Sequence, residues 1–185
     1  MILRLRHVMD GPDNSTLKLR RAVADRLTGP WRAGSVHEAD YRLEYDWGLR
    51  RVLAASLERR VNSDQIEDIV AGRRPLGDAF SGEQEALLGE GGPGLADPFD
   101  DLDVAGPITA LQWRDLEVNG FRGGSALRAE RWDYDGRSFI ELSVRVKDAG
   151  KASDRRARLV VLLEQRRLIP DQDARSEAAL RDLLS

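Results

Sequence analysis

The sequence has no cysteine and only two histidines among its 185 residues. Without cysteine there is no disulfide, no thiolate metal site and no cysteine nucleophile, and the composition is consistent with a reducing cytoplasm. His7 and His37 are far apart in the sequence and match no metal-ligand spacing, so we expect both to be structural or exposed. We therefore expect a cytoplasmic protein whose function does not depend on thiol or histidine chemistry.

Long apolar runs and an excess of one charge are also missing. No segment is apolar enough to span a bilayer, and no apolar signal-peptide core follows Met1. Charged residues make up 33% of the chain, yet the net charge is only −3. Because a general nucleic-acid-binding surface requires a basic balance, any anion site must be local. We expect neither membrane association nor general nucleic-acid binding.

The chain instead contains several segments in which apolar and charged residues alternate. The clearest is 139–147, where Ile140, Leu142 and Val144 alternate with Glu141, Ser143 and Arg145. Alternation with a period of two predicts a β-strand with one face on a core and one charged face. The same two-faced pattern predicts further strands at 1–7, 15–20, 41–47, 52–59, 108–118 and 126–134. Helix propensity would also allow a helix at 52–59, but the preceding Gly48 turn favours a hairpin strand.

Turn and capping signals connect these strands to a few helices. The turn-rich segment 10–14 predicts a hairpin between 1–7 and 15–20, and Asp135-Gly136 predicts a hairpin before 139–147. Helices are expected at 64–71, with Asp64 as N-cap, at 81–88, where Ser81 and Gln84 form a capping box, and at 153–168 and 176–184. A brief helical turn is expected at 21–27.

These elements predict an α+β fold. It would contain about seven to eight antiparallel strands with peripheral helices, the last of them in 153–185. One domain would cover residues 1–185. The segment 89–107 is rich in glycine, proline and aspartate but lacks the spacing of a calcium loop or a phosphate loop, so we expect a solvated linker there.

The charged strand faces allow two interpretations. In an open antiparallel sheet, such a face simply contacts water. If the sheet closes with the charged face inward, the enclosed cations and carboxylates must be satisfied, because an unpaired buried charge is very costly. Bound phosphate would balance the cations, with arginine binding it bidentately, and a divalent metal would balance the carboxylates.

The order of the strand motifs resembles that of the CYTH, or triphosphate tunnel, superfamily. Leu-Arg-Leu-Arg at 3–6, Thr-Leu-Lys-Leu-Arg-Arg at 16–21 and Arg-Leu-Glu-Tyr-Asp at 42–46 resemble its early strands. Phe-Ile-Glu-Leu-Ser at 139–143, after an acidic strand and a glycine-bearing turn, resembles its late strands. The stretch from Pro75-Leu76 to Phe80-Ser81-Gly82-Glu83-Gln84 is similar to the middle of an actinobacterial CYTH-like group.

The resemblance implies a closed antiparallel β-tunnel that binds a triphosphate-containing small molecule or inorganic polyphosphate, together with Mg²⁺ or Mn²⁺. The cations that would bind phosphate lie on the charged strand faces and are Arg4, Arg6, Lys18, Arg20, Arg114, Arg128, Arg145 and Lys147. The metal-side carboxylates would be Glu44, Asp46, Glu130 and Glu141. No catalytic residue is assigned.

The sequence departs from the family mainly in its acidic residues. The family's Glu-x-Glu-x-Lys first strand is missing, so it either lies outside this sequence or has been lost in this branch. The late Glu-x-Glu is Glu141-Leu142-Ser143, and the Lys-x-Arg pair is Gln112-Trp113-Arg114. These losses weaken metal binding more than anion binding, so we expect polyanion binding with degraded catalytic capacity.

Two alternatives stay open at this point. The first is an active divalent-metal-dependent triphosphatase, and the second is a non-catalytic structural or interaction domain. The missing first strand would also leave a sheet edge, and pairing of two copies into a homodimer is a further hypothesis.

Overall fold

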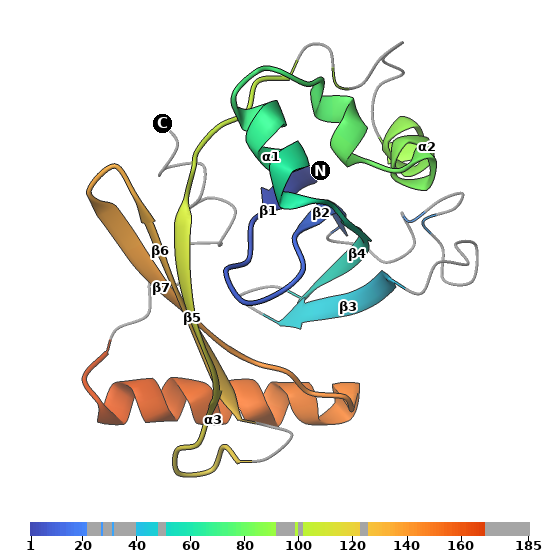
Figure 1. Ribbon diagram of the computed structural model, residues 1–185. Coiled ribbons are helices and arrows are strands. Elements are labelled where there is room, and N and C mark those ends of the chain that lie inside the picture. Colours follow the sequence, from blue (N-terminus) through green and yellow to red (C-terminus); the bar gives the residue numbers. More distant parts are fainter. Residues whose placement is uncertain are drawn as a thin grey trace. The chain divides into compact units, whose positions relative to one another are not determined.

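The computed structural model describes residues 1–21, 27, 31, 40–47, 51–91, 99, 102–122 and 126–168 (Figure 1). The chain divides into two compact units, each described here by itself. Unit 1 comprises Met1–Asp46 and Arg50–Val104, and unit 2 comprises Trp47–Leu49 and Ala105–Ser185. The described residues contain a four-stranded sheet, a three-stranded sheet and helices, which confirms the predicted α+β class.

The sheet of unit 1 is antiparallel where its register is defined, and its strands follow the order β1-β2-β4-β3. Leu17 of β2 lies opposite Leu3 of β1 on one side and Leu57 of β4 on the other. This register gathers the apolar side chains on one face and confirms the hairpin and the strand expected at 52–59. The strands are β1 (Ile2–Arg6), β2 (Asn14–Arg21), β3 (Tyr41–Trp47) and β4 (Arg51–Arg60).

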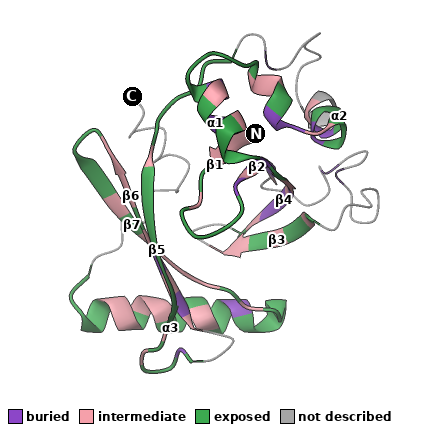
Figure 2. Cartoon of the chain, viewed as in Figure 1, coloured by how far each residue is buried: buried purple, intermediate pink, exposed green. Residues whose placement is uncertain are grey.

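Among the described residues, those on the apolar face of this sheet are the best buried (Figure 2). Leu17, Leu57 and Leu87 are fully buried together with Trp31, whose Nε1 donates to the Leu87 carbonyl at 2.8 Å. The Tyr41 hydroxyl donates to the Trp31 carbonyl at 2.6 Å, and burial raises the pKa of Tyr41. The helices of unit 1 are α1 (Ser63–Val70), the 3₁₀ helix η3 (Leu76–Ala79) and α2 (Gly82–Gly91).

The helix starts confirm one capping prediction and correct another. The Ser81 N–H donates to Gln84 Oε1 at 2.9 Å, and the Gln84 N–H donates to Ser81 Oγ at 3.2 Å, which is the predicted capping box. The N-cap of α1 is Asn62 rather than Asp64, and its side chain makes no capping bond. Asp64 lies in the first turn of α1, where its negative charge interacts favourably with the helix dipole. Helix α2 also continues to Gly91, past the expected end at 88.

Unit 2 contains an antiparallel sheet in the order β5-β6-β7. Asp135 and Gly136 have φ values of 47° and 73°, as a type I′ hairpin turn requires, so the predicted hairpin is confirmed. The β5–β6 register shifts between Trp113 and Leu116, where Asp115 has a φ of 53°. The elements are β5 (Thr109–Leu116), β6 (Leu127–Tyr134), β7 (Arg137–Val144), the 3₁₀ helix η5 (Ala149–Lys151) and α3 (Ala152–Gln165).

Both sheets are open within the described residues. Strands β1 and β3 form the edges of one sheet, and β5 and β7 form the edges of the other. The seven described strands are therefore not joined in a single hydrogen-bonded barrel. The helix expected at 176–184 and most of the turn at 21–27 lie outside the described residues. None of the described helices has the length and apolar character needed to cross a membrane.

Candidate anion-binding face

The face of the unit 1 sheet opposite its core is charged. We call it the charged face, and within it Lys18 lies opposite Ser56 and Arg20 opposite Ala54 across β2 and β4. On the other side of β2, Thr16 lies opposite Arg4 of β1, and Arg4 Nη2 donates to Thr16 Oγ1 at 3.3 Å. By strand alternation, the ionisable members of this face are Arg4, Arg6, Lys18, Arg20, Arg42, Glu44, Asp46, Glu58 and Arg60.

Asp46 links the two ends of this face. Its Oδ2 lies 3.1 Å from Arg20 Nη2 and 3.6 Å from Lys18 Nζ. Strand β4 separates β3 from β2, so this contact spans two strand spacings, or about 10 Å. Ala54 and Ser56, the β4 partners of Arg20 and Lys18, have small side chains that leave room for this contact. Two cations of β2 thus converge on one carboxylate oxygen above a floor of small side chains.

Among the described residues of the charged face, cations outnumber carboxylates. Six cations are described there, against the three carboxylates Glu44, Asp46 and Glu58, and Glu58 pairs with Arg42 at 3.5 Å. The side chains of Lys18 and Arg20 are only 23% and 25% exposed. Partial burial lowers the effective dielectric constant and strengthens the attraction of these cations for any anion that reaches them.

The predicted residues of unit 2 form a different arrangement. Glu130 of β6 lies between Gln112 of β5 and Glu141 of β7 in the strand register. Gln112 Nε2 donates to Glu130 Oε1 at 3.4 Å, and Arg114 Nε donates to Gln112 Oε1. The sheet therefore brings two carboxylates, an amide and one guanidinium into a row.

The remaining predicted cations of unit 2 are more dispersed. Arg128 lies opposite Ser143, one pair further along β6 and β7 on the same face. Arg145 and Lys147 follow the end of β7 at Val144, so the strand predicted to reach 147 is too long. These two cations do not continue the row through the strand register. Of the phosphate residues predicted in unit 2, the structure places Arg114 and Arg128 on strands of the sheet.

Within the described part of the chain, no group of three or more histidine or acidic side chains could hold a metal ion. Asp46 pairs with Lys18 and Arg20, and Glu130 and Glu141 form a pair of carboxylates across β6 and β7. Mg²⁺ takes six oxygen ligands in octahedral geometry, of which waters and substrate phosphates supply several. The Mg²⁺ or Mn²⁺ site therefore stays a prediction, and we derive no metal-dependent step.

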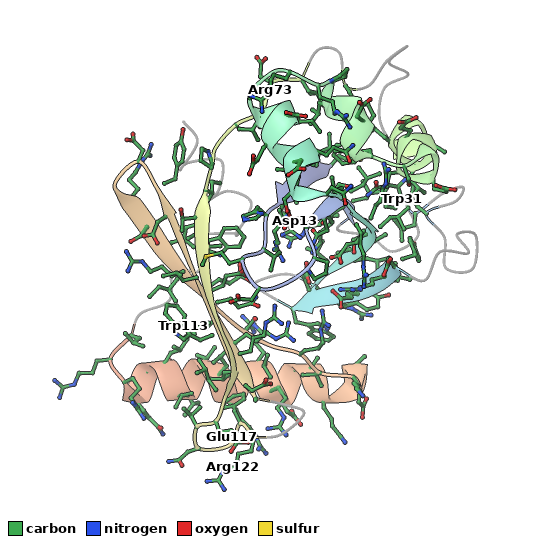
Figure 3. All side chains as sticks on the ribbon, in the orientation of Figure 1. Asp13, Trp31, Arg73, Trp113, Glu117 and Arg122 are labelled. Carbon is green, nitrogen blue, oxygen red and sulfur yellow. The ribbon has the colours of Figure 1, made fainter. Side chains whose placement is uncertain are left out.

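A buried carboxylate at the hairpin of unit 1 was not anticipated from the sequence. Asp13, in the loop between β1 and β2, is 4% exposed, and its Oδ1 accepts a 2.7 Å hydrogen bond from the Val8 N–H (Figure 3). Its Oδ2 lies 3.0 Å from Nδ1 of His7, whose side chain is exposed. The turn-rich segment 10–14 was the available signal, because aspartate often accepts backbone hydrogen bonds in turns.

These contacts shift the pKa values of both groups. Burial opposes ionisation of Asp13, but its bonds from His7, the Val8 N–H and Ser63 outweigh burial and lower the pKa of Asp13. The hydrogen bond to Asp13 raises the pKa of His7. His7 is thus both exposed and structural, whereas His37 lies outside the described residues. We assign this pair to the stability of the hairpin.

Comparisons with known proteins add no relative. No family model matches the chain, and the searches of curated proteins and of solved structures returned no match either. A function is therefore inferred from the charged face and from the order of the strand motifs.

Proposed function

We propose that the protein binds a polyanion, such as a triphosphate-containing small molecule or inorganic polyphosphate, on the charged face of unit 1. One observation supports this most directly: Lys18 and Arg20 converge on a single carboxylate oxygen of Asp46. The Asp46 carboxylate brings one negative charge to these two positive charges. We propose that an anion with several negative charges binds to the same cations.

The residue types suit phosphate. Arginine presents a planar fork that binds phosphate oxygens bidentately, and lysine acts as a compact point charge. Ile2 of β1 lies opposite Lys18 of β2. Arg4, two residues after Ile2, is therefore the diagonal neighbour of Lys18 across the two strands. Arg4, Lys18 and Arg20 therefore form a continuous cationic row, which matches a linear polyphosphate better than a single monoanion.

The CYTH-like tunnel belongs to the same proposal. Both sheets have the two-faced strands that such a tunnel requires, in the expected order along the chain. In the tunnel, the cations of unit 2, including Arg114 and Arg128, would act with those of unit 1. Spin labels on Ser56→Cys and Ser143→Cys would test closure without interference, because the chain has no native cysteine. A narrow distribution of short distances is expected, and a broad, long one would contradict the tunnel but not the charged face.

We assign no catalytic residue, and the described residues contain no group of three acidic or histidine side chains for a metal-dependent triphosphatase. It describes a cytoplasmic binding protein. Pairing of two copies through the edge strand β1 is a further part of the proposal. A monomeric mass by light scattering would contradict that pairing and leave anion binding untouched.

The experiment that tests the proposal is calorimetric titration with tripolyphosphate at low ionic strength. Wild type should bind, and Lys18→Ala should bind about tenfold more weakly or worse, because a charge-assisted hydrogen bond contributes about 1.5–3 kcal/mol. The matched control is Arg73→Ala, which removes an exposed cation paired with Asp68 and should leave the affinity unchanged (Figure 3). Absence of binding by wild type, or equal loss in both variants, would overturn the proposal.

A further inference from the structure

The carboxylate of Asp46 is an anion of the protein itself that contacts the cations of the charged face. Asp46 lies on β3 next to the strand's last residue, Trp47, and its Oδ2 lies within 4 Å of both Lys18 Nζ and Arg20 Nη2. Its carboxylate lies above Ala54 and Ser56, the register partners of Arg20 and Lys18. A carboxylate in this position has the charge and the oxygen ligands that an anionic ligand would present.

We infer that Asp46 is a built-in competitor for the anion site: its carboxylate holds Lys18 and Arg20 in the free protein and must be displaced when a polyanion binds. This inference rests on the proposed function and adds its regulation and selectivity. The carboxylate and a phosphate group carry like charges, so they cannot share the same two cations at close range without strong repulsion. Binding therefore exchanges one anion for another.

The exchange predicts which ligands bind. A monoanion offers Lys18 and Arg20 no more charge than Asp46 already does, and Asp46 is held in place by the chain, so a free monoanion has no advantage. An anion with several charges gains contacts with neighbouring cations such as Arg4, which Asp46 does not supply. The intramolecular carboxylate thus sets a threshold that favours polyphosphates over single-charged anions.

The family resemblance predicts the opposite role for Asp46, and the two roles can be separated. If Asp46 held a metal that bridges to phosphate, its removal would weaken binding, and only when the metal is present. If Asp46 competes with the ligand, its removal strengthens binding without any metal. In the competitor model, the apparent dissociation constant equals the intrinsic one divided by the fraction of protein in which the cations are available.

The test compares Asp46→Asn with Glu58→Gln by calorimetric titration with tripolyphosphate, with EDTA present and at fixed ionic strength. Both variants remove one negative charge from the same face, but Glu58 pairs with Arg42 rather than with Lys18 and Arg20. Asp46→Asn should bind about tenfold more tightly than wild type, because a competing ionic contact is gone, whereas Glu58→Gln should change the affinity by about twofold or less through screened charge alone. Asp46→Asn should also gain measurable binding of inorganic phosphate.

Each other outcome is decisive. Equal tightening in both variants would overturn the competitor role and leave the proposed function standing. When the titration is repeated with Mg²⁺ in place of EDTA, binding that Mg²⁺ strengthens in wild type but not in Asp46→Asn would overturn it in favour of a metal ligand. If neither wild type nor Asp46→Asn binds, the proposed function itself fails.

A measurement on the unaltered protein avoids dependence on a folded variant. In wild type labelled with ¹³C aspartate, the side-chain carboxyl signal of Asp46, assigned by its loss in Asp46→Asn or by through-bond correlation, should shift as tripolyphosphate is added. The signal of Asp133, which pairs with Arg131 in unit 2, is the internal reference and should stay in place. Binding without any change at Asp46 would contradict displacement.

Discussion

The two sheets show how the same alternating sequence pattern can lead to different structural outcomes. In unit 1, Leu17 and Leu57 are fully buried in one cluster with Leu87 of α2, so the apolar face has a defined cover. In unit 2, Leu127 and Ala129 are buried, but Trp113 and Ile140 are exposed. A covered apolar face holds its strands in one register, and it therefore holds the opposite, charged face in a defined arrangement. This difference makes unit 1 the better platform for a binding site.

The charged faces of the two sheets also differ, and this difference too favours unit 1 as the anion-binding unit. On the charged face of unit 1, cations are in excess among the described residues, and Asp46 reaches across β4 to Lys18 and Arg20. In unit 2, two carboxylates, Glu130 and Glu141, are direct cross-strand neighbours. Two carboxylates opposite each other repel and destabilise a sheet unless a cation lies nearby. Anion affinity is thus expected to arise mainly from unit 1.

The largest expected effect is on the core of unit 1. Leu57→Ala should lower the free energy of unfolding by about 2–5 kcal/mol, because it removes a fully buried side chain and leaves a cavity. Ile140→Ala in β7 is the matched change in unit 2, where the side chain is 64% exposed, and it should cost about 0.5 kcal/mol or less. Urea unfolding followed by circular dichroism measures both. Equal losses would show that the two sheets are covered to a similar extent.

A smaller effect is expected from a buried amide. Gln84 accepts from Ser15 Oγ at 3.2 Å and donates to the Leu57 carbonyl at 3.0 Å, besides its capping bond with Ser81. Gln84→Ala should cost about 1–3 kcal/mol, because it leaves buried polar groups unsatisfied.

Gln112 provides the comparison in unit 2. It is exposed and contacts Glu130 and Arg114, so Gln112→Ala should lower the free energy of unfolding by about 0.5 kcal/mol or less, with both glutamine variants measured by urea unfolding. A larger loss at Gln112 than at Gln84 would reverse the comparison between the two units.

The smallest effect concerns the pH dependence of unit 1. The pKa of Asp13 is below its ordinary 3.8, so its contribution to stability is present above that pH and is lost as the pH falls through the folded pKa. The pKa of His7 is above its ordinary 6.5, so its contribution is complete below that pH and is lost as the pH rises through the folded pKa. The pair therefore stabilises most between pH 3.8 and 6.5.

Variants of this pair test the assignment. His7→Gln should remove the loss of stability that the pair causes as the pH rises. Asp13→Asn should remove that loss and also the loss of stability as the pH falls. Urea unfolding midpoints measured across pH test both expectations. Asp133→Asn is the control in unit 2, where the partner is the arginine Arg131 rather than a histidine. An unchanged pH profile in both variants of the pair would contradict the pKa directions.

Local sequence signals predicted the local features well. Alternation located all seven described strands, Asp135-Gly136 predicted the tight hairpin, and Ser81 with Gln84 predicted the capping box. Errors occurred at element ends, where β7 stops before Arg145 and Asn62 rather than Asp64 precedes α1. Element ends depend on tertiary packing and on competing hydrogen bonds, so short-range patterns constrain them weakly.

The candidate site was predicted as a set of residues but not as an arrangement. Lys18, Arg20 and Asp46 were all expected on charged strand faces, yet Asp46 was assigned to a metal, and the structure shows it paired with the two cations. No local pattern indicates that pairing, because β3 and β2 are not neighbours in the sheet. The prediction of a metal role for Asp46 stays open to the titration described above.

The sequence by itself determined that this protein has two-faced strands, because side-chain direction alternates with every residue of an extended chain. It likewise determined the cation-rich character of β1 and β2. Only the tertiary structure decided the strand order β1-β2-β4-β3, which places the small side chains of Ala54 and Ser56 between β2 and β3. Strand order depends on contacts between residues distant in the chain, and those contacts put Asp46 within reach of Lys18 and Arg20.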